Sequence, residues 1–345
     1  MKDPPRYSLT DAFAADAYVN WASRLMAGLY PECDWSCPHA AYLDAGILNY
    51  VWRVDVPGRA FYLKQALGRV KEHHRIGADL AAVSPARIQA ETRALYFLEE
   101  VLPFCCGTLV PRVAWHDVSN NVLWTEAVSG ETTSLQCELL AGRCDPGSAE
   151  AMGELLALMH QASNAPCLWP SEQEDEENWE RFLRMRTTGV VGSHPAGQEF
   201  DPAVLKAARA LAREARRHAR RGMLSHLDAA PKNVLLHPSG AVTLLDFELG
   251  ANISDPAYDV GFLAGHYLLM GENRPEMRPA ARRAATALEG AYRAAAGVDD
   301  GWPDRVRRYS GLVLLYRLCG SSPAPCLDPG RYDSIRSEGI RLLLQ

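Results

Sequence analysis

The sequence lacks a large charge imbalance, a long apolar run, internal repeats and low-complexity segments. Its formal net charge is -6, which argues against nucleic acid as the main partner because nucleic-acid-binding proteins concentrate positive charge. No apolar stretch approaches the length of a membrane span, and the first residues lack the apolar core of a signal peptide. We therefore expect a cytoplasmic protein whose partners are neither nucleic acids nor membranes.

The nine cysteines follow no spacing typical of a metal site or a disulfide framework. Their number is odd, Cys105 and Cys106 are adjacent, and Cys33 and Cys37 have no histidine-bearing partner motif. Reduced thiols are expected, and a structural metal site is the less favoured alternative. The 345 residues, 48% of them apolar, are enough for one large or two modest domains.

What the sequence does contain is a dense set of oxygen-bearing side chains around one predicted hairpin. Two β-rich runs around a Pro/Gly turn, within residues 234–245, predict two antiparallel strands. Such a hairpin returns its far end beside its start, so Asn233 is expected next to Asp246. Asp228 and Glu248 lie only a few residues away. Hard oxygen ligands that converge in this way suit Mg²⁺, which also binds waters and substrate phosphates.

This stretch resembles the catalytic region of the kinase-like phosphotransferases. His226-x-Asp228 followed by Asn233 matches the loop H-x-D-x-x-x-x-N. Residues 246–248 (Asp-Phe-Glu) stand where protein kinases carry Asp-Phe-Gly. Residues 254–259 (SDPAYD) are similar to the small-molecule branch, which includes aminoglycoside phosphotransferases, choline kinases and methylthioribose kinases. Protein kinases would instead have a long activation segment that ends in Ala-Pro-Glu, and the sequence has none.

The resemblance implies an α+β, two-lobed protein-kinase-like fold. Its N-terminal lobe is expected to be a five-stranded antiparallel sheet with one helix, and its C-terminal lobe is expected to be mainly helical. Residues 1–128 would bind the nucleotide, and residues 129–345 would carry the catalytic loop and the acceptor site. The implied activity is ATP- and Mg²⁺-dependent phosphorylation of a hydroxyl on a small polar molecule, that is, a kinase with an alcohol group as acceptor.

Short β-rich runs predict the strands of the first lobe. Three of them form a meander within residues 42–66, and two more cover residues 110–117 and 122–128. An amphipathic helix is predicted before them, over residues 9–30, with Thr10 or Asp11 as its cap. In kinase folds the first turn of the meander covers the ATP phosphates. Here this turn holds a single glycine, Gly46, which a plain hairpin turn explains equally well.

Lys64 and Glu91 are predicted to form an ion pair. Strand alternation places Lys64 on the face opposite Phe61 and Leu63. Glu91 falls on the apolar stripe of a predicted helix, three residues after Ile88. A carboxylate that faces a core needs a cation, and Lys64 is the natural candidate. The pair resembles the kinase lysine and glutamate that place the α- and β-phosphates. The alternative is a solvated glutamate at the helix rim.

Three segments of the first lobe are similar to methylthioribose kinases. They are residues 44–51 (DAGILNYV), 64–66 (KQA) and 86–91 (ARIQAE), with a long insert over 69–85. This similarity makes Gly46 and Asn49 candidate nucleotide-binding residues. It also favours a sugar of the methylthioribose type as the acceptor.

The resemblance assigns a hinge and an acceptor-binding residue. The hinge follows the fifth strand, where backbone groups of Glu126, Ala127 and Val128 would receive the adenine edge. Arg317 stands where methylthioribose kinases have one of two arginines that hold the acceptor sugar. Tyr316 replaces the other arginine, which weakens the assignment of methylthioribose itself.

In the catalytic loop, Asp228 would accept or orient the acceptor hydroxyl. Asn233, Asp246 and Glu248 would hold Mg²⁺ against the phosphates. His226 is expected to order the loop by hydrogen bonding rather than to transfer protons.

Lys232 is an unusual residue to find directly before the metal-binding asparagine. A cation there would offset charge on the moving phosphoryl group, and the alternative is that the lysine points to solvent. Small-molecule kinases commonly have glycine where this chain has Leu227. The loop of residues 231–233 (Pro-Lys-Asn) is closer to the aminoglycoside and protein-kinase forms than to methylthioribose kinases.

Two alternative functions stay open at this point. One is an aminoglycoside or other antibiotic phosphotransferase, which would be indicated if the acidic residues 172–177 line the cleft. The other is a nucleotide-binding pseudokinase that acts as a scaffold, against which the complete catalytic set argues. The identity of the acceptor, the choice between ATP and GTP, and the choice between monomer and homodimer do not follow from the sequence.

Overall fold

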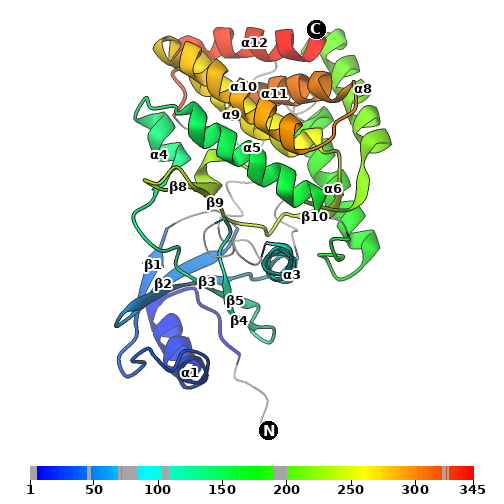
Figure 1. The fold of residues 1–345 in the computed structure, drawn as a ribbon. Coiled ribbons are helices and arrows are strands. Elements are labelled where there is room, and N and C mark those ends of the chain that lie inside the picture. The colour runs from blue at the N-terminus through cyan, green and yellow to red at the C-terminus, as the bar shows by residue number, and fades with distance from the viewer. Residues whose placement is uncertain are drawn as a thin grey trace. The chain divides into compact units, whose positions relative to one another are not determined.

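The computed structural model describes residues 6–44, 48–68, 71, 84–102, 109–162, 164–189, 200–320, 324 and 326–345. The chain forms two compact units, Met1–Ser129 and Gly130–Gln345 (Figure 1). The first unit contains an antiparallel sheet and the second is mainly helical, which confirms the predicted α+β kinase-like fold. Among the helices of the described residues, none is both long and apolar enough to span a bilayer.

The first unit is built on the predicted five-stranded sheet. Its strands, in spatial order, are β1 (His39–Leu43), β2 (Tyr50–Val56), β3 (Arg59–Gln65), β5 (Val122–Glu126) and β4 (Val113–Asp117). All neighbouring strands are antiparallel. The turn between β2 and β3 ends at Gly58, whose φ of +83° favours glycine. The meander predicted from the sequence is therefore confirmed, except that residues 45–47, which include Gly46, lie outside the described residues.

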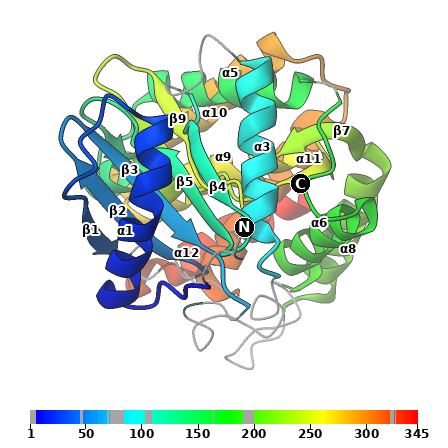
Figure 2. The same cartoon turned by 90° about the horizontal axis from the view of Figure 1, so that it is seen from below.

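Two helices accompany this sheet. Helix α1 (Ala12–Leu29) is the predicted amphipathic helix, and Asp11 caps it by accepting a hydrogen bond from the Ala14 amide. Figure 2 shows α1 beside the strands of the sheet. The buried face of α1 packs with Phe61, Leu63 and other apolar residues of the strands in one aromatic-rich core. Helix α3 (Arg87–Val101) is the predicted helix that bears Glu91. Because strand side chains alternate, Lys64 points away from the α1 core and toward α3.

The second unit contains most of the helices. They are α4 (Leu135–Leu140), α5 (Pro146–Gln161), α6 (Glu172–Arg186), α8 (Pro202–His218), α9 (Ala257–Asn273), α10 (Arg278–Ala295), α11 (Trp302–Cys319) and α12 (Tyr332–Leu344). Helix α9 is central, since every residue in it except Leu268 is buried. A Cβ at Gly261 would lie 2.6 Å from the Tyr309 Cβ, so the glycine is what permits the close approach of α9 and α11.

Short strands lie between these helices, and the predicted catalytic residues stand in the segments that connect the strands. They are β6 (Thr133–Ser134), β7 (Arg220–Ser225), β8 (Val234–Leu236), β9 (Val242–Leu244) and β10 (Ala251–Ser254). Strands β8 and β9 form the predicted antiparallel hairpin, in which Val234 pairs with Leu244. Strand β7 pairs with β10, which brings the start of the catalytic loop beside the segment that precedes α9.

Candidate functional site

The catalytic loop is fastened to helix α9 by one buried carboxylate. Asp259 Oδ2 accepts hydrogen bonds from the Ser225 hydroxyl and the His226 amide, both at 2.8 Å, and Oδ1 accepts one from the Leu227 amide at 2.9 Å. Burial raises the pKa of Asp259, but the hydrogen bonds that it accepts from His160 and from the His226 amide outweigh burial and lower it. Asp259 therefore holds the loop as an anion. The sequence pattern included this residue in the SDPAYD run but gave it no role.

His226 links the loop to the end of the hairpin. Its Nδ1 accepts from the Asp228 amide at 3.1 Å, so Nε2 carries the proton and donates to the Leu245 carbonyl at 2.8 Å. Burial lowers the pKa of His226, which keeps the ring neutral. These contacts are those of a residue that orders the loop, the role expected for it from the sequence.

Asp228 is surrounded by cations and by an amide. Arg186 donates to Oδ1 at 2.7 Å, and the Lys232 Nζ lies 3.3 Å from Oδ2. The side-chain nitrogen of Asn233, Nδ2, donates to the same Oδ2 at 3.2 Å. Burial raises the pKa of Asp228, but the charges of Lys232 and Arg186 outweigh it, so the pKa lies below its usual range. The carboxylate is therefore ionised at neutral pH.

Arg186 is a site residue that the sequence analysis missed. Besides Asp228 it contacts the Leu227 carbonyl and the Tyr258 hydroxyl, and its Cζ lies 4.0 Å from the centroid of the Phe262 ring. The signal was available, because Arg186 follows Phe182 by four residues on the buried face of α6. A charge on an apolar stripe needs a partner, which is the same reasoning that picked out Glu91.

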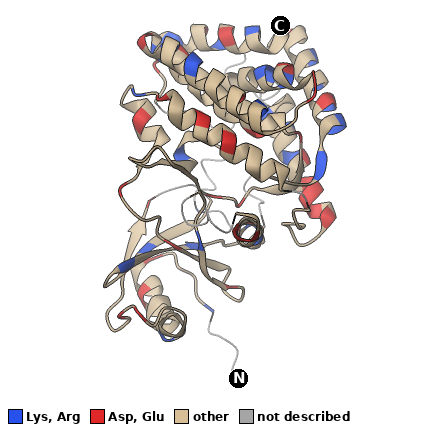
Figure 3. Cartoon of the chain, viewed as in Figure 1, with Lys and Arg blue, Asp and Glu red and all other residues tan. Residues whose placement is uncertain are grey.

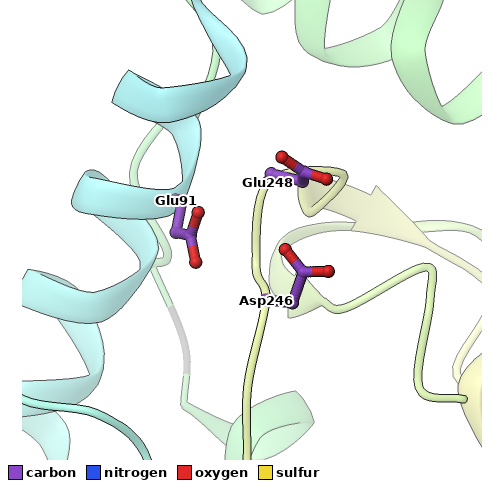
Figure 4. A group of neighbouring side chains, drawn as sticks. All are labelled: Glu91, Asp246 and Glu248. Carbon is purple, nitrogen blue, oxygen red and sulfur yellow. The ribbon is translucent and has the colours of Figure 1, made fainter. Parts of the chain in front are cut away.

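Two acids follow the hairpin and lie close to each other. Figure 4 shows Asp246 and Glu248 on the segment after β9, and carboxylate oxygens of the two lie within 4.8 Å of one another. The Lys232 Nζ is 3.9 Å from Asp246, so this lysine stands between the two aspartates of the site. Burial lowers the pKa of Lys232, but the three nearby carboxylates outweigh burial and raise it. Its ammonium is therefore charged, and half of the side chain is exposed to solvent.

Leu227 adopts a backbone conformation that favours glycine. Its φ is +60°, and its side chain is fully buried. The left-handed conformation costs a non-glycine residue about 1–2 kcal/mol. The hydrogen bond from its amide to Asp259 and the contact of its carbonyl with Arg186 hold it there.

The predicted ion pair of the first unit is present. The Lys64 Nζ lies 2.8 Å from Glu91 Oε2, and both side chains are largely buried. Glu91 is one of the buried residues of helix α3, and Figure 4 labels its side chain. The contact between Lys64 and Glu91 is therefore confirmed, whereas their role toward phosphates stays a prediction.

We expect Glu91→Gln to impair use of the nucleotide more than use of the acceptor. The amide removes the charge that holds Lys64, so kcat/KM for ATP should fall by about tenfold, equivalent to 1.4 kcal/mol. Steady-state kinetics with each substrate varied in turn would measure this. An equal loss in both kcat/KM values would contradict a nucleotide-specific role for the pair.

The other nucleotide-binding candidates have varied surroundings. Gly46 lies outside the described residues. Asn49 is buried, and its Oδ1 accepts a hydrogen bond from Arg87 at 2.9 Å. At the hinge, the Glu126 amide donates to the Arg112 carbonyl and the Ala127 amide donates to the Ala60 carbonyl, both at 2.9 Å.

Arg317 lies in the last turn of helix α11, in charged surroundings. Burial lowers the pKa of Arg317, and the charge of Arg186 acts in the same direction, whereas Tyr316 and Asp228 raise it. Arg186 also lies 5.7 Å from the Tyr316 ring. Arg186 of α6 therefore reaches the neighbourhood of Tyr316 and Arg317.

The acidic run at residues 172–177 makes contacts within the helical unit. Asp175 is fully buried and accepts hydrogen bonds from the Leu168 amide at 2.6 Å and the Asn252 amide at 2.9 Å. Glu176 pairs with Arg221 of strand β7, and Figure 3 shows the acidic residues of α6 in red. These contacts show that part of the run stabilises the helical unit. They give no support to the run as a binding surface for a cationic antibiotic.

Comparison with known proteins identifies the family. Residues 39–298 match the model of the APH family, which is described as a phosphotransferase enzyme family. The chain belongs to this phosphotransferase family. The match confirms the superfamily predicted from the catalytic motifs, whereas the similarity of the first lobe to methylthioribose kinases stays a prediction. Comparison with curated proteins found no match.

Solved structures share the fold of this family member. A putative aminoglycoside phosphotransferase from Ralstonia eutropha is 13% identical with a TM-score of 0.54, and the alignment covers 96% of each chain. An ethanolamine kinase from Plasmodium vivax is 12% identical with a TM-score of 0.52, covering 97% of this chain and 88% of that one. An amicoumacin kinase in complex with AMP-PNP, Ca²⁺ and Ami is 14% identical with a TM-score of 0.54, covering 88% of this chain and 87% of that one.

Proposed function

We propose that this phosphotransferase transfers the γ-phosphoryl group of ATP, with Mg²⁺, to a hydroxyl of a small polar molecule. The observation that carries the proposal is the ionised Asp228, held between Arg186 and Lys232 in a loop that also bears Asn233. A carboxylate fixed in this way can orient a hydroxyl for attack. The complex of an amicoumacin kinase with AMP-PNP and Ca²⁺ supports use of a nucleotide and a divalent cation by this fold.

The oxygen donors near the hairpin fit Mg²⁺. Asp246 and Glu248 offer carboxylates within 4.8 Å of one another. The side-chain Nδ2 of Asn233 donates hydrogen bonds to Asp228, so the side-chain oxygen Oδ1 is the atom that Asn233 offers to a metal. Hard oxygen ligands of this kind are those that Mg²⁺ prefers. When bound, the ion would neutralise charge on the phosphate oxygens.

The chain's own residues would then position the acceptor and the phosphoryl group. Asp228 would accept a hydrogen bond from the acceptor hydroxyl and take its proton as the new O–P bond forms. The bond between the γ-phosphorus and the bridging oxygen would break at the same time, and ADP would leave. Because the pKa of Asp228 is low, orientation contributes more than basicity until the new O–P bond is largely made. Lys232 would stabilise charge on the moving phosphoryl group.

The first unit would bind the rest of the nucleotide. Lys64, held by Glu91, would contact the α- and β-phosphates. At the hinge, the amides of Glu126 and Ala127 already donate within the sheet. The adenine edge would therefore receive its hydrogen bond from the Val128 amide and donate to the Glu126 carbonyl.

We propose a sugar of the methylthioribose type as the acceptor, bound near Asp228 with Arg317 as one contact. The support is the similarity of the first lobe and the presence of both Arg186 and Arg317 in the surroundings of Asp228. A phosphorylation screen of sugars, nucleosides and aminoglycosides, each with ATP and Mg²⁺, tests this. Turnover of methylthioribose or a related sugar is expected. Efficient turnover of an aminoglycoside alone would instead identify a resistance enzyme.

The presence of Lys64, Glu91, Asp228, Asn233 and Asp246 argues against a pseudokinase scaffold, because a scaffold does not need the residues of phosphoryl transfer. The matching test is slow ATP hydrolysis without any acceptor, which a competent site should show and which should require Mg²⁺. Nucleotide binding with no hydrolysis and no transfer to any acceptor would favour the scaffold.

We expect Lys232→Met to lower kcat by roughly ten- to a thousand-fold, the span for removing one preorganised electrostatic contact. The physical reason is the position of its ammonium between Asp228 and Asp246. Lys232→Arg should restore only part of the rate, because a planar fork replaces a compact charge. Rates would be measured at saturating ATP and acceptor. A Lys232→Met enzyme that turns over at the parent rate would show that the lysine is not part of the machinery.

A further inference from the structure

Arg87 is a fully buried cation at the start of helix α3. Its guanidinium donates to Asn49 Oδ1 at 2.9 Å and to the Leu48 carbonyl at 3.1 Å. It also donates to the Leu67 carbonyl at 3.2 Å and to the Ser84 carbonyl at 3.1 Å. One side chain thus joins three segments that are far apart in the sequence. A guanidinium suits this task because its donors point outward in a rigid plane.

Each of these segments belongs to the nucleotide side of the proposed site. Leu48 and Asn49 directly precede strand β2, and Asn49 is itself a predicted nucleotide-binding residue. Leu67 follows β3, the strand of Lys64. Arg87 itself precedes Glu91 by four residues, so the two side chains lie on one face of α3. Helix α3 therefore holds the lysine strand through Glu91 and the β1–β2 connection through Arg87.

A second cation holds the other end of the same connection. The Lys71 Nζ lies 2.7 Å from Asp44 Oδ1, and the side chain of Lys71 is only 9% exposed. The Lys71 amide donates to the Leu48 carbonyl at 3.3 Å, so Leu48 receives hydrogen bonds from both Lys71 and Arg87. The residues on both sides of the connection are thus anchored to the segments that follow β3 and begin α3.

We propose that Arg87 is a positioning residue for nucleotide binding, and that Asn49 acts through Arg87 rather than by contact with the nucleotide. Loss of the contact would release Leu48 and Asn49 from α3, so a nucleotide would have to order these two residues on binding. This inference rests on the proposed function, since it presumes that ATP binds to this unit.

A double-mutant cycle with Asn49→Ala and Arg87→Lys tests the proposal. Asn49→Ala should raise the Kd for ATP–Mg²⁺ by about tenfold, and Arg87→Lys by at least as much because Arg87 also holds Leu48 and Leu67. The double variant should match Arg87→Lys alone, because the contact between Asn49 and Arg87 is already lost in that single variant. Calorimetric titration gives the Kd, and scanning calorimetry shows whether each variant is folded. Arg93→Gln, an exposed arginine on the same helix, is the matched control and should leave the Kd within about twofold.

Asn49→Asp distinguishes a role through Arg87 from direct contact with the nucleotide, because it keeps a side-chain oxygen at the same place. An aspartate accepts from Arg87 at least as well as asparagine does, so the Kd for ATP–Mg²⁺ should stay within about threefold of the parent value. If Asn49 instead contacted the phosphates, the added negative charge would weaken binding at least as much as Asn49→Ala does.

Three results would overturn the inference. They are additive effects in the cycle, a Kd unchanged in every folded variant, and an Asn49→Asp protein as impaired as Asn49→Ala. The parent protein distinguishes these from failure of the proposed function. If the parent binds no ATP, the proposed function fails first and the inference falls with it.

Discussion

Asp228→Asn is expected to lower kcat by about 10²- to 10⁴-fold, the usual contribution of a positioned general base, while the Kd for ATP–Mg²⁺ changes little. The substitution keeps the shape of the side chain but removes the charge that faces Arg186 and Lys232. The acceptor hydroxyl would then lose both its orienting acceptor and the group that takes its proton. Single-turnover rates and nucleotide calorimetry on the same preparation would separate the two effects.

Two controls make this result interpretable. Asp300→Asn changes an exposed aspartate of the same unit and should leave both kcat and Kd unaltered. Thermal unfolding of Asp228→Asn shows whether the unbalanced charge of buried Arg186 destabilises the fold. If a folded Asp228→Asn enzyme keeps its kcat within a few-fold of the parent, the base lies elsewhere and the loop has been assigned wrongly.

The second large effect is expected for Asp246→Asn. Loss of one carboxylate ligand should weaken ATP–Mg²⁺ binding and lower kcat/KM by about 10²- to 10³-fold, the range for removal of one preorganised electrostatic group. The Mg²⁺ concentration that gives half-maximal rate should rise in parallel. Activity measured across a Mg²⁺ titration, with a chelator as the zero point, would show both changes.

Glu248→Gln provides the graded comparison for Asp246→Asn. Glu248 is the second acid of the pair, and its substitution should shift the Mg²⁺ requirement in the same direction. ATP binding by Asp246→Asn that is as tight as in the parent, with the same Mg²⁺ requirement, would place the metal site away from the hairpin.

Features that depend on nearby residues were accessible from the sequence. The hairpin of β8 and β9 followed from two β-rich runs around a Pro/Gly turn, and its register sets Val234 opposite Leu244. The position of Asn233 near Asp228 followed from a spacing of five residues, and the structure joins them at 3.2 Å. Even the distant pair of Lys64 and Glu91 was predictable, because each residue has an unusual place in the periodic pattern of its own element.

Arg186 shows where such reasoning fell short. Its place on the buried face of α6 marks it as a charge in need of a partner, but several acids were available in the chain. The choice of Asp228, 42 residues further along, depends on how α6 packs against the loop after β7. The sequence predicted Asn49 as a nucleotide-binding residue, and only the structure shows that its Oδ1 accepts a hydrogen bond from Arg87.

By itself, the sequence determined the order of the elements, the spacing of the catalytic loop and the membership of a phosphotransferase family, because these depend on local propensity and on motifs. Only the tertiary structure decided the left-handed conformation of Leu227, the neutral tautomer of His226 and the charged neighbours that keep Asp228 ionised. The physical reason is that the protonation state and backbone strain of a buried group are set by the atoms that replace water around it. Those atoms come from Arg186 of α6, Asp259 of α9, Lys232 of the loop and the Leu245 carbonyl after the hairpin, which only the packed core brings together.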